Sequence, residues 1–143
     1  MNYPLAYLIG VVLALAVSLF ARFVGLDRDR AFYPTVMLVI AALYGLFAVM
    51  GGHPGELTLE WIMMGGFIVL SVLGFRLNLW FVVAALFAHG VFDFFHGHLV
   101  SNPGVPAWWP AFCGTYDITA AGCLAWLLWS ARTAASNHAG KIR

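Results

Sequence analysis

The chain has 143 residues, of which 63% are hydrophobic and only 9% are charged, and its mean hydropathy is +0.90. A soluble domain carries about 25% charged residues, so this composition excludes a water-soluble fold and predicts an integral membrane protein surrounded by the lipid bilayer. The formal net charge is +1, and no dense cluster of Lys and Arg occurs. The sequence therefore argues against a nucleic-acid partner.

Five apolar segments approach or exceed the length of about 18–20 residues that crosses the bilayer as a helix. The first covers about 4–21 and has no positive charge before it, so we expect a retained helix rather than a signal peptide. The other four are expected at about 33–50, 57–74, 79–97 and 108–131. Membrane strands would be half as long and would alternate between polar and apolar residues. We therefore predict an all-α fold, a single transmembrane domain over residues 1–143 that forms a bundle of five transmembrane helices.

The basic residues predict how these segments are oriented. All of them lie in the first connection, in the third connection or in the C-terminal tail: Arg22, Arg28, Arg30, Arg76, Arg132, Lys141 and Arg143. With five spans and the N-terminus outside, every one falls on the cytoplasmic side, as the positive-inside rule requires. We therefore expect an external N-terminus and a cytoplasmic C-terminus, in the bacterial cytoplasmic (inner) membrane.

The fourth segment contains an unusual polar run, AHGVFDFFHGH, at residues 88–98. His89, Asp93 and His96 follow the spacing i, i+4, i+7, which places them on one stripe of a helix. His98 lies about 200° around the helix from His96, so we expect it to point elsewhere. Ionisable residues inside a membrane are costly, and they are functional candidates by default.

The fifth segment carries a matching polar stripe. Cys113 and Asp117 are four residues apart, and Tyr116 lies beside Asp117. The short loop between the two segments predicts antiparallel neighbours. Counted inward from the outer end, His89 and Asp117 both lie at a depth of about 13–14 Å, and Asp93 and Cys113 both lie at about 8 Å. The two stripes are therefore expected to face each other rung by rung.

Imidazole and carboxylate groups from facing helices are typical of a divalent metal site. We expect the metal ligands to be His89, Asp93, His96 and Asp117, with zinc favoured over iron or copper. The metal would lower the pKa of a bound water, and Asp93 and Asp117 are the catalytic candidates that would act as general base or orient a histidine. Further candidates near this site are Cys113, Tyr116, His98 and Glu60.

The leading hypothesis is a membrane-embedded, metal-dependent hydrolase with an outward-facing site and a lipid or other apolar small molecule as substrate. A membrane oxidoreductase is an alternative. Another is a non-catalytic accessory subunit or small-ligand-binding bundle, in which the His and Asp groups are a structural clamp between helices. Association into a homo-oligomer or a larger membrane complex stays open in each case.

The two runs HGVFDFFHGH and VPAWWPAFCGTYD also carry a resemblance. They are similar to small bacterial polytopic membrane proteins of unassigned function that contain H-G-x-x-D-x-x-H followed by W-x-P-x-F-C-x-x-x-D. The resemblance covers about the last third of the chain, and it implies no activity.

Overall fold

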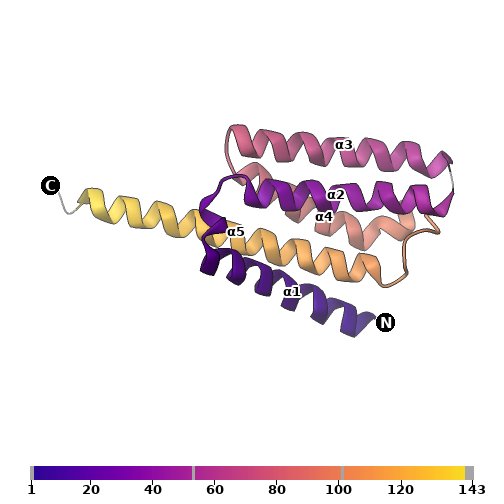
Figure 1. Ribbon diagram of the computed structural model, residues 1–143, viewed down its shortest axis with the longest axis horizontal. Helices are drawn as coiled ribbons and strands as arrows, with labels where there is room; N and C mark the ends of the chain where they lie inside the picture. Colours follow the sequence, from indigo (N-terminus) through magenta and orange to yellow (C-terminus); the bar gives the residue numbers. More distant parts are fainter. Residues whose placement is uncertain (1, 53, 101, 141–143) are drawn as a thin grey trace.

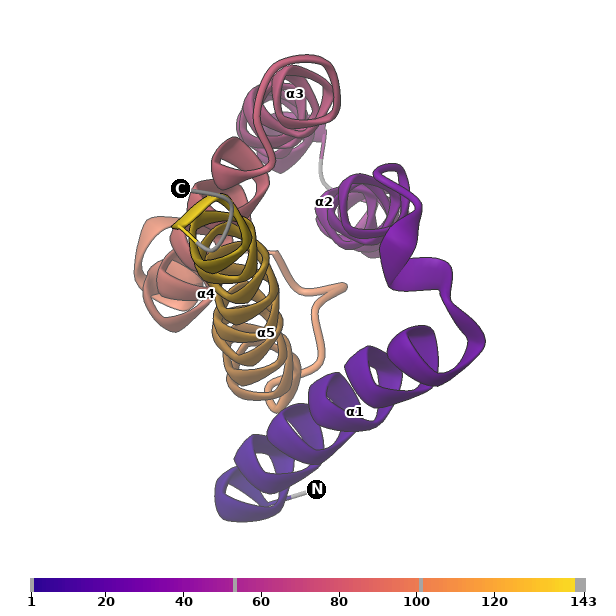
Figure 2. The same cartoon turned by 90° about the vertical axis from the view of Figure 1, so that its left-hand side faces the viewer.

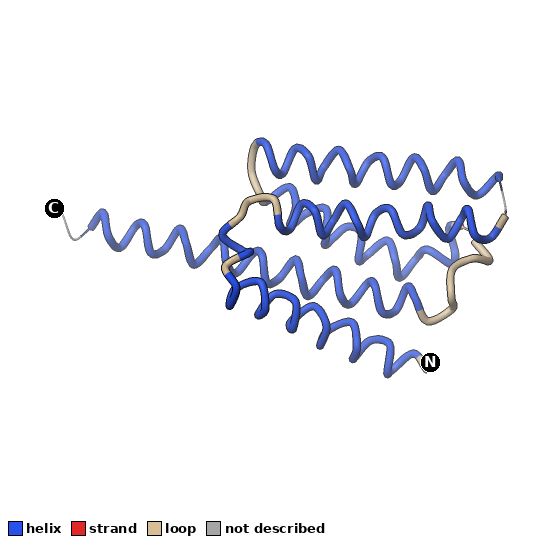
Figure 3. Tube along the Cα trace, in the orientation of Figure 1, coloured by secondary structure: helices blue, strands red, loops and turns tan. Residues whose placement is uncertain are grey.

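The computed structural model describes residues 2–52, 54–100 and 102–140, and these ranges contain helices and no strand. Five long helices follow one another in chain order: α1 (Tyr3–Val24), α2 (Phe32–Gly51), α3 (Pro54–Arg76), α4 (Trp80–Leu99) and α5 (Trp109–Gly140). A short 3₁₀ helix, η1 (Leu26–Arg28), lies between α1 and α2. The prediction of an all-α fold is therefore confirmed for the described residues (Figure 3).

Local sequence signals set several of the helix ends. The side chain of Asn2 accepts a hydrogen bond of 3.4 Å from the backbone nitrogen of Leu5, which caps α1. Gly25 ends α1 with a φ of 89°, and Gly52 ends α2 with a φ of 68°. These left-handed conformations favour glycine because it has no Cβ, so each helix stops where a glycine permits the turn.

Within the described residues, four helices are long and apolar enough to cross a membrane, namely α1, α2, α4 and the part of α5 from Trp109 to Ala134. The predicted segments coincide with the helices to within a few residues, except that α5 continues past the expected end at 131 to Gly140. Helix α3 lies beside α2 in the same bundle (Figure 1), and its role as a fifth span stays a prediction.

The helices form an antiparallel bundle in which α4 contacts both α3 and α5. Helix α2 packs mainly on α3, and α1 packs on α5. The view along the bundle shows α1 leaning away from α2 (Figure 2), and these two helices have no extensive contact. The end of α5 extends beyond the other helices (Figure 1).

The bundle has an apolar core, but it also exposes many large apolar side chains and buries several polar ones. Phe23 is 91% exposed and Leu19 is 66% exposed, both on α1. The buried polar side chains among the described residues are Glu60, Ser71, His89, Asp93, His96 and Asp117. This distribution is consistent with a membrane protein, because lipid solvates apolar groups and polar groups turn to the bundle interior.

Arginine contacts gather at the end of the bundle where α1 meets α2. The guanidinium of Arg22 lies 5.6 Å from the ring centre of Trp126, a cation–π contact between α1 and α5. Arg30 donates a hydrogen bond of 3.3 Å to the carbonyl oxygen of Gly74 near the end of α3. Residues 141–143, with the last two basic side chains, lie outside the described ranges.

Candidate metal centre

The site depends on a close crossing of α4 and α5 at two glycines. A Cβ placed on Gly90 would lie 2.8 Å from the carbonyl oxygen of Gly114, and one on Gly114 would lie 3.0 Å from the carbonyl oxygen of Gly90. Small residues of this kind let membrane helices approach until their backbones touch. The crossing brings residues beside these glycines on α4 and α5 into direct contact.

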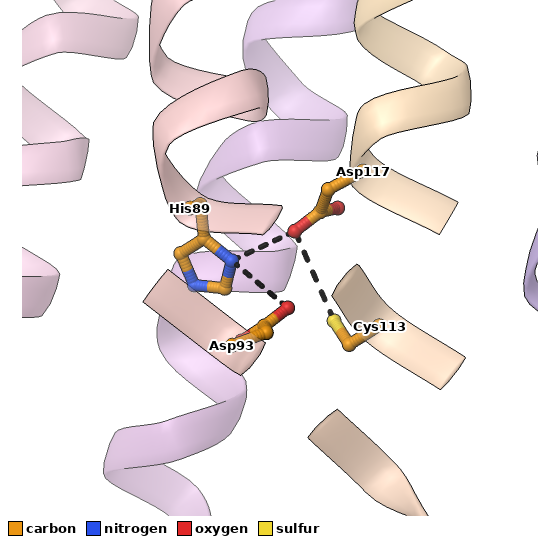
Figure 4. Close-up of side chains that lie close together, drawn as sticks. All are labelled: His89, Asp93, Cys113 and Asp117. Atoms are coloured by element: carbon orange, nitrogen blue, oxygen red, sulfur yellow. Dashed lines mark hydrogen bonds and ion pairs between the residues drawn. The ribbon is translucent and has the colours of Figure 1, made fainter. Parts of the chain in front are cut away.

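Four buried side chains meet at this crossing, two from each helix (Figure 4). His89 Nδ1 lies 2.7 Å from Asp117 Oδ2 and 3.6 Å from Asp93 Oδ2. Cys113 Sγ lies 4.0 Å from the same oxygen of Asp117. One ligand atom from each residue lies within 4.8 Å of all the others. We call these four residues the His89 group.

The carboxylates of the His89 group are short of hydrogen-bond donors. Both oxygens of Asp93, and Oδ1 of Asp117, are buried without a hydrogen-bond partner in the part of the chain that the structure describes. A buried carboxylate oxygen without a partner costs several kcal/mol, because it loses its hydration and gains nothing in return. The negative charge of the two aspartates beside one imidazole therefore needs compensation, either by a metal ion or by protonation of these side chains.

The spacing of the His89 group suits a metal after a small adjustment. Ligands at about 2.0–2.3 Å from a tetrahedral zinc ion lie about 3.3–3.8 Å from one another. The separation of 3.6 Å between His89 Nδ1 and Asp93 Oδ2 fits directly. The 2.7 Å between His89 Nδ1 and Asp117 Oδ2 is a hydrogen-bond distance, and it would have to lengthen by about 0.6–1.1 Å. The group can therefore hold a metal ion, and zinc as its identity stays a prediction.

His96 lies in a second buried polar group, toward the end of α4. Its Nε2 is 3.2 Å from Glu60 Oε1 on α3, and Asn102 Nδ2 donates a hydrogen bond of 2.9 Å to that same oxygen. Asn102 is fixed in turn by a hydrogen bond of 3.0 Å from the backbone nitrogen of Gly104. The structure thus pairs His96 with Glu60, whereas Cys113 completes the group of four at the crossing.

Tyr44 on α2 connects the two polar groups, and no sequence pattern pointed to this residue. Its ring stacks on His96 with centroids 4.1 Å apart, and its centroid is 5.8 Å from that of His89. The hydroxyl is buried and interacts electrostatically with the carboxyl group of Asp93, without a hydrogen bond of standard geometry. Tyr44 is preceded and followed by apolar residues on α2, so no spacing pattern set it apart.

The remaining candidate residues, His98 and Tyr116, lie outside the two buried polar groups. His98 is exposed on α4, as its angle around the helix predicted, and it belongs to neither polar group. Tyr116 is half-buried on α5, where it lines an apolar groove with Cys113. The groove has a volume of about 370 Å³ and lies between α1, α2 and α5. Its apolar walls include Val17, Val36, Ile40, Leu43, Trp109 and Phe112.

Comparisons with protein-family models, with curated proteins and with solved structures found no match for this chain. The functional assignment therefore rests on the residues themselves.

Proposed function

We propose that this chain is a membrane-embedded, metal-dependent hydrolase that acts on a lipid or another apolar substrate. The observation that carries the proposal is the shortage of donors in the His89 group, where three buried carboxylate oxygens have no hydrogen-bond partner among the described residues. A divalent cation would satisfy these oxygens and balance the charge of two aspartates. Its ligands would be His89, Cys113 and Asp117, which leaves the fourth position of a tetrahedral ion open for a water molecule that can donate to Asp93.

The residues of the His89 group would have different roles in hydrolysis. A bound divalent metal supplies a Lewis acid, which lowers the pKa of water toward neutrality. His89 and Asp117 already contact each other across the crossing, so they would fix the position of the site. Neither oxygen of Asp93 has a hydrogen-bond partner among the described residues, so we assign Asp93 as the base that takes a proton from the attacking water. The water oxygen would bond to the carbonyl carbon or phosphorus atom of the substrate, and the bond from that atom to the leaving oxygen would break. The leaving oxygen would depart with the proton that Asp93 took from the water.

We further infer that α3 is a fifth span, with the N-terminus outside and the C-terminus in the cytoplasm of a bacterial cell. Helix α3 is 23 residues long and packs between α2 and α4, both of which have the length and composition of membrane spans. Arg30 and Arg76 both lie at the end of the bundle where α3 ends, which agrees with a cytoplasmic face rich in positive charge.

The metal content of the purified protein tests the proposal. We expect about one equivalent of zinc, iron or copper per chain by elemental analysis, and His89→Ala and Asp117→Ala should each abolish it. His98→Ala is the matched control, because this exposed histidine on the same helix belongs to neither polar group. Hydrolysis of fluorogenic long-chain esters and phosphoesters in micelles should stop on chelation. A protein without metal, whose variants only melt at lower temperature, would overturn the proposal.

One observation favours a structural clamp as the second candidate. The 2.7 Å between His89 Nδ1 and Asp117 Oδ2 is shorter than the spacing of two ligands on one metal ion, and it describes a direct hydrogen bond between α4 and α5. In that case the protein is a non-catalytic subunit or a binding protein. The same variants would then lose stability and no metal.

A further inference from the structure

We propose that the apolar groove between α1, α2 and α5 binds the hydrocarbon chain of a single-chain acyl amphiphile, with the polar linkage of the amphiphile at Cys113. The inference deepens the proposed function, since it names the class of substrate that the same site would receive. It rests on three features of the groove, namely its lining, its direction and its contact with the His89 group.

The lining fits hydrocarbon and no charged group. None of the residues that line the groove is Asp, Glu, His, Lys or Arg, and the members that carry a polar side-chain atom are Thr35, Trp109, Cys113 and Tyr116. An ionic head group inside this groove would lose its hydration without a partner, at a cost of several kcal/mol. The occupant is therefore an apolar chain, and any ionic head group lies outside the groove.

The groove runs along the helices, in the direction that lipid chains take in a bilayer. On α2 its lining extends from Phe32 to Leu43, which corresponds to about 16 Å along the helix axis. Its long axis therefore accommodates one extended chain. Helices α1 and α2 both line the groove and have no extensive contact with each other, so a chain can enter between them from the surrounding lipid without leaving hydrocarbon.

Cys113 joins the groove to the candidate metal centre. It lines the groove, and its Sγ lies 4.0 Å from Asp117 Oδ2 in the His89 group. Cys113 also lies one helical turn from Trp109, toward the outer end of the groove. A chain that lies along Val36 and Val17 thus directs its polar linkage toward Cys113 and the His89 group. This arrangement selects substrates in which one long chain carries an ester or a comparable linkage at its end.

Quenching of tryptophan fluorescence by brominated chains tests the proposal. In a variant that keeps Trp109 and replaces the other five tryptophans with phenylalanine, Trp109 reports from the groove wall. The protein is held in micelles without metal, and dibromostearic acid and a lysophosphatidylcholine with a brominated chain are titrated in. We expect saturable quenching by both probes. A companion variant that keeps Trp61, which is exposed on α3 outside the groove, should show only a gradual, non-saturating response.

A matched pair of substitutions on α2 identifies the site. Val39 lines the groove and is 58% exposed, whereas Leu46 is 52% exposed and does not line it. Val39→Phe should raise the half-saturating probe concentration about tenfold, the equivalent of roughly two displaced methylene groups. Leu46→Phe should leave the concentration unchanged. Equal effects of both variants, or quenching of Trp109 that does not saturate, would mean bulk lipid only and would overturn the inference.

The outcome is separable from that of the proposed function, because binding is measured without metal and without turnover. If the protein never takes up metal and still shows saturable quenching, the groove binds an acyl chain and the protein is not a metal-dependent hydrolase. If the protein binds metal through His89 and shows no saturable quenching, the metal site is supported and the groove does not bind an acyl chain.

Discussion

Gly90 and Gly114 face each other across the interface of α4 and α5 with no room for a side chain between them. A Cβ on Gly90 would lie 2.8 Å from the Gly114 carbonyl oxygen and 3.1 Å from the Cβ of Asp117. The crossing and the His89 group are therefore parts of one arrangement. Widening the interface at either glycine moves Asp117 away from its partners on α4.

This relationship predicts that Gly90→Ala and Gly114→Ala lower both the stability and the metal content of the protein. Forcing a methyl group into a packed interface typically costs about 1–3 kcal/mol, which should appear as a lower melting temperature in detergent. Gly97→Ala on α4 and Gly122→Ala on α5 are the controls, since a Cβ at these positions meets nothing within 4 Å. Unchanged metal binding in both crossing variants would show that the site tolerates separation of the helices.

A second prediction concerns the sulfur ligand. Cys113 is buried in the His89 group, whereas Cys123 lies on the same helix outside it. Protein reconstituted with Co²⁺ should show the near-ultraviolet thiolate-to-cobalt absorption that a coordinated sulfur produces, since a thiolate is a metal ligand. Cys113→Ser should abolish this absorption, and Cys123→Ser should preserve it. Absorption that survives Cys113→Ser would exclude this residue from the ligand set.

A third prediction separates the two buried polar groups. Glu60→Ala removes the acceptor that both Asn102 and His96 use, which typically costs about 1–3 kcal/mol because buried polar atoms lose their partner. Glu60→Gln keeps an oxygen acceptor and should recover most of that loss. Thr58→Ala, at an exposed position of the same helix, is the control. Thermal unfolding in detergent measures each effect.

The variant His96→Ala tests whether His96 is a metal ligand. The structure pairs His96 with Glu60, so His96→Ala should lower the melting temperature and still leave about one equivalent of metal bound. Loss of the metal in His96→Ala would instead support the ligand role that its position on the stripe with His89 and Asp93 predicted. Elemental analysis of the two variants His96→Ala and His89→Ala, side by side, gives the answer.

Helical periodicity was sufficient to predict the crossing of α4 and α5. The spacing of four residues put His89 and Asp93 on one stripe, and Cys113 and Asp117 on another, while the short loop made the two helices antiparallel neighbours. Depth counting paired His89 with Asp117, and the structure has these two side chains in direct contact. The prediction of this contact was correct because both stripes lie on regular helices joined by a short connection.

Helical periodicity could not predict the contacts that come from helices farther away in the chain. Tyr44 on α2 stacks on His96, although 52 positions separate them in the chain and no periodicity links the two. Glu60 was recognised as a polar residue of α3, but its partner depends on how α3 packs against α4. Asn102 reaches Glu60 from the loop between α4 and α5, whose path no helical rule describes.

A final prediction concerns the number of spans. Five spans place the two ends of the chain on opposite sides of the membrane, and four spans place them on the same side. In a variant whose two native cysteines are replaced by serine, single cysteines at Asp29 and Pro103 test the two faces, because both residues are exposed and lie at opposite ends of the bundle. Asp29 lies between α1 and α2, beside three of the basic residues, and Pro103 lies between α4 and α5.

With five spans and the N-terminus outside, a membrane-impermeant maleimide added to intact cells should label the cysteine at position 103 and not the one at position 29. Cysteines added before Met1 and after Arg143 complete the test, and only the first should react from outside. Permeabilised cells should label all four, which controls for reactivity. Labelling of both termini from the same side would reject α3 as a span, because an even number of crossings returns the chain to the side on which it began.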